Sequence, residues 1–166
     1  MKTILICGDS YSDANNISCD FASIGHWSWV DRLQAHYTVR CIAKVAASNL
    51  DIWRQIQTAT DDWDHVIVNL SDLRRRNSYH WKSGAVKLRK EDEQRANLRV
   101  AREIAQRQNT LCWTPFPGYS GIAGIHYIPL EEHNEMYTKS VRFECTSHHL
   151  TREGNDQLYK WMLEQL

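Results

Sequence analysis

Short apolar runs alternate along the chain with longer stretches in which apolar residues recur at helical spacing, and this alternation constrains the fold more than any other feature. Strands that alternate with helices of this kind pair in parallel through right-handed crossovers, and their sheet carries helices on both faces. We therefore predict a single α/β domain over residues 1–166. The predicted strands are Thr3–Cys7, Tyr37–Ala43, Val66–Leu70, Thr110–Thr114 and a short one around His126–Ile128, and the predicted helices are His26–His36, Asn49–Thr60, Lys90–Gln108 and Gly154–Leu166.

Composition and charge exclude several classes of protein. The chain has 166 residues, and its 20 Lys and Arg residues balance 20 Asp and Glu residues, so no overall attraction to nucleic acid or an anionic membrane is expected. No apolar run approaches the roughly 20 residues that span a bilayer, and the run at the start is too short for a signal peptide. The odd number of cysteines, five, favours reduced thiols over a disulfide framework. We expect a cytoplasmic protein without a nucleic-acid or membrane partner.

The first candidate motif lies where the first predicted strand ends, in Gly8, Asp9 and Ser10. Sheets of this kind bind ligands at the carboxyl ends of their strands. Gly8 permits a tight turn, and the backbone amides that follow it can serve both a nucleophile and an oxyanion. A turn of small polar residues that caps a helix explains the same tripeptide equally well.

The second candidate motif precedes the last predicted helix, where His148 and His149 are followed by a candidate helix cap, Thr151. An imidazole has a suitable pKa to take a proton from a serine hydroxyl near neutral pH. A surface histidine in a loop is the alternative interpretation.

Taken together, the two motifs resemble those of the SGNH (GDSL) hydrolase family. Gly-Asp-Ser follows the first strand, and His-Leu-Thr-x-Glu-Gly precedes the last helix. The resemblance implies a three-layer α/β/α sandwich and an acyl hydrolase, such as an esterase, lipase or carbohydrate deacetylase. We accordingly predict a flavodoxin-like parallel sheet of order 2-1-3-4, with a fifth strand as an option. Weaker similarities lie at Trp29 and Leu33, at Ala46–Asn49, at Trp63–Leu70 and at Thr114–Pro117.

The resemblance implies roles for particular residues. Ser10 would be the nucleophile, with its own amide as an oxyanion donor, and His149 the general base. The glycine of the family's second block corresponds to Ala46, where the Cβ is expected to oppose a positive φ. The asparagine of the third block corresponds to Leu73. The candidate substitutes for that donor are Ser71, Arg74 and Asn77, with Ser71 and Arg74 preferred.

The family's catalytic aspartate corresponds to Thr146, which could orient an imidazole through its hydroxyl but carries no charge. Glu144 is the alternative carboxylate, if the loop brings it to His149. We expect Ser10 and His149 to lie within hydrogen-bond reach, directly or through one water. A dyad without a carboxylate should be slow rather than inactive, because nucleophile and base still share a proton.

Further residues are predicted to contact a substrate or shape its pocket. A basic segment, 74–76, would favour an anionic substrate if it binds one, although a solvated loop explains it as well. Residues 118–140 are predicted to border the crevice, because long segments without regular structure are often functional. The predicted substrate-binding residues are Asp9, Asn49, Tyr79 and Trp81, and the predicted specificity residues of segment 118–140 are Tyr119, Tyr127 and Tyr137.

The sequence thus predicts a serine ester hydrolase that acts on a small acyl ester, for which an O-acetylated carbohydrate is one candidate. Neither a cofactor nor a metal is predicted. A binding protein with a decayed catalytic site, on the same scaffold, is the main alternative. A metal site is a third hypothesis, with candidate ligands Cys145, His148 and His149 and more distant ones at His126 and His133.

Overall fold

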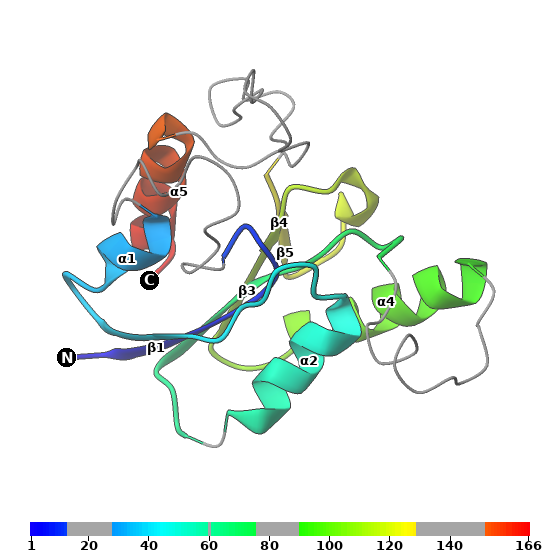
Figure 1. Ribbon diagram of the computed structural model, residues 1–166, viewed down its shortest axis with the longest axis horizontal. Helices are drawn as coiled ribbons and strands as arrows, with labels where there is room; N and C mark the ends of the chain where they lie inside the picture. The colour runs from blue at the N-terminus through cyan, green and yellow to red at the C-terminus, as the bar shows by residue number, and fades with distance from the viewer. Residues whose placement is uncertain (13–27, 60, 76–89, 129–151) are drawn as a thin grey trace.

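Parallel strands and helices alternate along the chain in the computed structural model, which describes residues 1–12, 28–59, 61–75, 90–128 and 152–166 (Figure 1). The described elements are β1 (Thr3–Cys7), α1 (Trp29–Leu33), β2 (Thr38–Cys41), α2 (Asn49–Thr58), β3 (His65–Asn69), α4 (Lys90–Ala105), β4 (Thr110–Thr114), the 3-10 helix η2 (Pro117–Tyr119), β5 (Ile125–Tyr127) and α5 (Arg152–Gln165).

The five strands form one parallel sheet of order β2-β1-β3-β4-β5. The predicted order 2-1-3-4 is therefore confirmed, and the optional fifth strand is present beside β4. Strand β1 lies between β2 and β3, with Leu5 opposite Arg40 of β2 and Val66 of β3. All five strands end at the same edge of the sheet, because they run in the same direction.

Alternate residues of the strands enter two separate cores, one on each face of the sheet. On one face, Ile4 and Ile6 pack with α1 and α5. On the other, Leu5 and Cys7 pack with α2 and α4. Figure 1 shows these helix pairs on opposite sides of the strands, which gives the three layers of the predicted α/β/α sandwich. The period-two alternation of fully buried residues is typical of a sheet covered on both faces.

Local capping residues determine where the helices begin and end, and some helices are shorter than predicted. Helix α1 is shorter than the predicted 26–36, because the Ser28 side chain accepts the Asp31 amide and caps the helix there. Helix α2 begins at a capping box formed by Ser48 and Asp51, as local sequence allows. Helix α4 ends at Ala105, before the chain turns at Asn109 with a φ of 54°.

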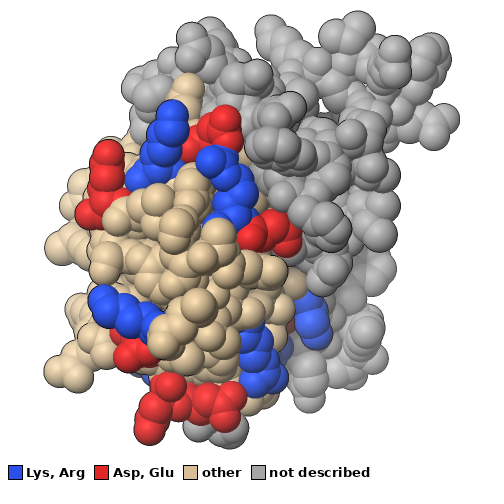
Figure 2. Space-filling view, turned by 90° about the vertical axis from the view of Figure 1, so that its left-hand side faces the viewer, with Lys and Arg blue, Asp and Glu red and all other residues tan. Residues whose placement is uncertain are grey.

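On the face shown in Figure 2, the basic and acidic side chains of the described residues are interspersed. Several charges of the described residues are paired, such as Arg40 with Asp61. Within the described parts of the chain, no helix is long and apolar enough to cross a bilayer. The described cysteines, Cys7, Cys41 and Cys112, are free thiols.

Candidate active site

Three segments meet at the carboxyl edge of the sheet, and Gly8 lies at their junction. The Gly8 carbonyl accepts the Lys44 amide at 3.1 Å, which joins β1 to the segment after β2. A Cβ added to Gly8 would lie 2.9 Å from the Asn69 Cβ and 3.2 Å from the Ser12 Cβ. Only glycine therefore lets the end of β1 approach the end of β3 this closely.

Gln55 of α2 holds the same glycine through its buried side-chain amide. Its Oε1 accepts the Gly8 N–H at 2.9 Å, and its Nε2 donates to the Gly8 carbonyl at 3.1 Å. The two bonds fix the two peptide units on either side of Gly8, the second of which leads into Asp9 and Ser10. A helix on one face of the sheet thus positions the candidate nucleophile.

Ser10 occupies a tight turn and is partly accessible, as a nucleophile must be. The Asp9 carbonyl accepts the Ser12 amide at 3.1 Å, and Asp9 Oδ1 accepts the Tyr11 amide at 3.2 Å. Among the described residues, no acceptor engages the Ser10 N–H. This amide is therefore free to donate to a ligand oxygen.

Ala46 lies in the segment after β2 and has a φ of 63°, in the left-handed region. The expectation that its Cβ would oppose a positive φ is therefore wrong. Two bonds around Ala46 explain why: the Lys44 amide donates to Gly8, and the Ala47 amide donates back to Lys44 at 3.2 Å. The surrounding hydrogen bonds outweigh the intrinsic cost of about 1–2 kcal/mol. The Ala46 amide, like that of Ser10, has no acceptor among the described residues.

The segment after β3 is held by a buried hydrogen-bond network rather than by its own turn. Asn49 accepts the Ser71 amide at 2.9 Å and donates to the Tyr119 hydroxyl, which in turn donates to the Ser71 carbonyl. Asn97 of α4 donates to the Leu73 and Arg75 carbonyls, both at 2.9 Å. Asn49 is fully buried and supports this segment, and its predicted contact with substrate stays a prediction.

The preferred substitutes for the third-block asparagine are otherwise engaged. The Ser71 amide already donates to Asn49, and only its buried hydroxyl has no partner among the described residues. The exposed guanidinium of Arg74 binds the Asp72 carboxylate, with Nη2 at 2.6 Å and Nε at 3.0 Å. This pairing lowers the pKa of Asp72 and raises that of Arg74. The Ser71 amide and two nitrogens of the Arg74 guanidinium are therefore engaged, and the role of these residues as oxyanion donors stays a prediction.

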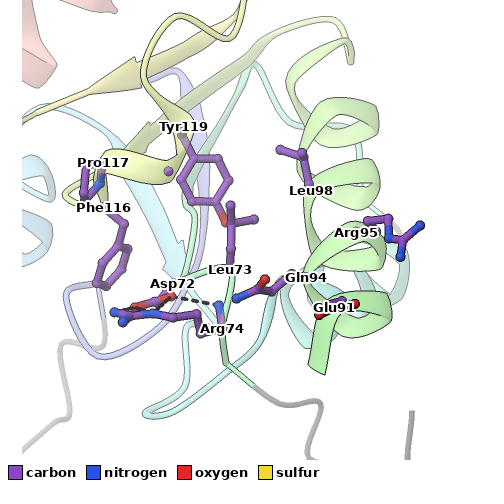
Figure 3. Close-up of a pocket in the computed structure, with 11 residues that line it drawn as sticks. Asp72, Leu73, Arg74, Glu91, Gln94, Arg95, Leu98, Phe116, Pro117 and Tyr119 are labelled. Atoms are coloured by element: carbon purple, nitrogen blue, oxygen red, sulfur yellow. Dashed lines mark hydrogen bonds and ion pairs between the residues drawn. The ribbon is translucent and has the colours of Figure 1, made fainter. Parts of the chain in front are cut away.

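A pocket of about 690 Å³ opens between the segment after β3, η2 and helix α4 (Figure 3). Leu73, Phe116 and Tyr119 form its apolar part, and Leu98 projects toward them from α4. Leu73 fits beneath Gly118, since a Cβ there would lie 2.9 Å from its Cδ1. The residue in place of the family's asparagine thus contributes to an apolar wall.

Comparison with solved structures gives several matches, among them two that cover nearly the whole chain. The psychrotrophic esterase EstA from Pseudoalteromonas sp., in a form inhibited by monoethylphosphonate, matches with a TM-score of 0.54 and 15% identity over 99% of this chain and 96% of its own. TesA matches with a TM-score of 0.55 and 13% identity over 99% of this chain and 98% of its own. The chain has an SGNH-like fold. No protein-family model and no curated protein matches the sequence.

Several residues of the predicted site lie outside the described residues. The predicted general base, His149, is among them, so its distance from Ser10 stays a prediction. The predicted metal ligand His126 is described, and its ring packs against Trp161 at 5.2 Å between centroids. Among the described residues, no group of His, Cys, Asp or Glu is arranged to hold a metal. The others outside the described residues are Asn77, Tyr79, Trp81, His133, Tyr137, Glu144, Cys145, Thr146 and His148.

Sequence reasoning missed two supporting residues of the candidate site, Gln55 and Asn97. A signal for each was present. Gln55 lies on the apolar stripe of its helix with Ile52 and Ile56, and Asn97 is followed at helical spacing by Ala101. A polar side chain on a buried stripe needs a hydrogen-bond partner, and here both partners are backbone groups at the carboxyl edge.

Proposed function

We propose that the protein is a serine ester hydrolase of the SGNH type, with Ser10 as nucleophile and His149 as general base. Its substrates are small acyl esters, and O-acetylated carbohydrates are the natural class proposed for it. The observation that carries the proposal is the pair of unengaged amides, on Ser10 and Ala46, at the edge where parallel sheets bind ligands.

The proposed reaction uses these groups in two steps. The Ser10 hydroxyl attacks the ester carbonyl while His149 takes its proton, and the oxyanion accepts from the amides of Ser10 and Ala46. The alcohol leaves with the proton from His149, and water then releases the acid by the same route. Loss of one oxyanion donor typically costs about 10²–10³ in kcat. With Leu73 in place of a third donor, we expect slow turnover.

The pocket beside Leu73 supports a role in binding the acyl or alcohol group. Its apolar part comes from Leu73, Leu98 and Phe116, and the ion pair of Arg74 with Asp72 lies at its side (Figure 3). Such a mixture suits a small group with an apolar body and a polar end.

Hydrolysis of p-nitrophenyl acetate tests the proposal. The wild type should hydrolyse it above background, and Ser10→Ala should abolish the difference. Ser120→Ala, an exposed serine after η2, is the matched control and should retain the wild-type rate. Equal rates for the wild type and Ser10→Ala would contradict the proposal.

A binding protein with a decayed site is the second candidate. It is favoured by the engagement of the Ser71 amide and the Arg74 guanidinium, which leaves the pocket but occupies two candidate donor groups. This function predicts that acylated sugars bind without being hydrolysed, with the same affinity for the wild type and Ser10→Ala. Calorimetric titration of both proteins separates the two functions.

A further inference from the structure

The carboxyl of Asp9 is fully buried next to the candidate nucleophile, and only part of it is hydrogen-bonded. Its Oδ1 accepts the Tyr11 amide at 3.2 Å, and its backbone carbonyl accepts the Ser12 amide at 3.1 Å. These bonds close the turn on either side of Ser10. The second carboxyl oxygen, Oδ2, is buried and has no partner among the described residues.

The hydroxyl of Ser71, in the segment after β3, also acts on this carboxyl. This hydroxyl is buried and without a partner among the described residues, and it lowers the pKa of Asp9. The Ser71 backbone is fixed by Asn49 at its amide and by Tyr119 at its carbonyl. A hydroxyl can donate to a carboxylate or accept from a carboxylic acid, so Ser71 can serve Asp9 in either state.

Burial and the neighbouring charges together set the pKa of Asp9, and so the pH at which its carboxyl changes between the ionised and the protonated state. Burial raises its pKa from 3.8 to about 6, and the positive charge of Arg75 opposes that rise. Tyr119 in η2 is the other titratable group coupled to Asp9 among the described residues; its own pKa is raised by burial and by the charges of Asp72 and Asp9. Tyr119 thus stays protonated, and Asp9 is the group that changes charge near neutral pH.

We infer that Asp9 is a positioning residue whose ionised carboxylate holds the turn of Ser10 through the Tyr11 amide. An ionised acceptor makes shorter and stronger bonds than a neutral one. Protonation would weaken the bond to the Tyr11 amide and loosen the turn. The inference rests on the proposed function for the role of Ser10, but the state of the turn can be tested without activity.

The first test follows the backbone amides of Ser10, Tyr11 and Ser12 by NMR over about pH 4–8. In the wild type, their shifts should titrate together with a midpoint near 6. Asp9→Asn should abolish this titration, and the control Asp61→Asn, at an exposed ion pair, should retain it. Amides that do not respond to pH, or that titrate unchanged in Asp9→Asn, would overturn the inference.

Ser71→Ala gives a second variant, should Asp9→Asn not fold. Because the hydroxyl lowers the pKa of Asp9, its removal should move the midpoint of the amide titration to higher pH. An unchanged midpoint would contradict the link between Asp9 and Ser71.

The pH profile of p-nitrophenyl acetate hydrolysis links the turn to catalysis. In the wild type, the fall of kcat/KM in acid should correspond to the binding of about two protons, one by Asp9 and one by His149. In Asp9→Asn, the fall should correspond to about one proton. The plateau value of kcat should be about tenfold lower in this variant, with KM unchanged. Identical profiles would overturn the positioning role. If no protein hydrolyses the ester, the proposed function fails, and the amide titration still decides the inference.

Discussion

Gln55 and Gly8 form a two-point contact between helix α2 and the end of strand β1. The Gln55 side chain accepts the Gly8 N–H at 2.9 Å and donates to the Gly8 carbonyl at 3.1 Å. The next two residues are Asp9 and Ser10, so this contact sets the direction in which the candidate nucleophile leaves the sheet. The integrity of the site therefore depends on a residue that takes no part in the chemistry.

Gln55→Leu should destabilise the fold and impair hydrolysis together. The Gly8 carbonyl keeps its bond from Lys44, but the buried Gly8 N–H would be left without a partner. An unsatisfied buried donor costs about 1–3 kcal/mol in the free energy of unfolding. Urea denaturation measures this loss. Gln57→Leu, at an exposed position of the same helix, should change stability little, and equal stabilities for the two variants would refute the role of Gln55.

Ala46→Gly should raise the hydrolysis rate severalfold. Glycine adopts the φ of 63° without strain and removes a Cβ next to a proposed oxyanion donor. Asn109→Gly is the matched control, because Asn109 has a similar φ of 54° but precedes β4 at the opposite end of the sheet. Both substitutions should alter stability by less than about 1 kcal/mol. A rate increase in both variants, or in neither, would argue against Ala46 as a donor.

Asp9→Asn should change the pH dependence of stability in a defined direction. The pKa of Asp9 is about 6 in the folded state and 3.8 when exposed, so the folded state binds more protons between these values. The wild type therefore loses stability as the pH rises from about 4 to 6, by about 3 kcal/mol for this shift. The variant lacks this loss, so its advantage should grow with pH. A difference in unfolding free energy that is constant from pH 4 to 7 would contradict the burial of an ionising Asp9.

Leu98→Trp should change the preference for acyl chain length. The larger side chain would fill part of the pocket opposite Leu73 and Phe116, so butyrate and hexanoate esters should lose more kcat/KM than acetate (Figure 3). Arg102→Trp, at an exposed position of α4, is the control and should leave the preference unchanged. Equal losses for all chain lengths would mean that the pocket does not hold the acyl group.

The positions of the strands can be predicted from the sequence, because a strand that is buried on both faces needs an uninterrupted run of apolar residues. Ile4 and Ile6 on one face and Leu5 and Cys7 on the other form an apolar run that only a doubly covered strand requires. Parallel pairing and the crossover rule then restrict the order of the strands. The position of Ser10 at the carboxyl edge follows from the same argument.

The details of the site depend on contacts between distant segments, which sequence spacing does not encode. The left-handed φ of Ala46 contradicts local preference and is held by the bond between Lys44 and Gly8. Ser71 was predicted as an oxyanion donor, but its amide is bound by Asn49, 22 residues earlier. Whether a backbone amide is free for a ligand or bound by a distant side chain can therefore be decided only from the folded structure.

Mass spectrometry after reaction with a phosphonate ester reagent tests the central claim, that Ser10 is an activated nucleophile. The account predicts one covalent adduct per chain in the wild type, located on the peptide that contains Ser10, and no adduct in Ser10→Ala. The control Ser120→Ala should be labelled like the wild type. A wild-type protein that stays unlabelled, or an adduct that persists in Ser10→Ala, would contradict the assignment.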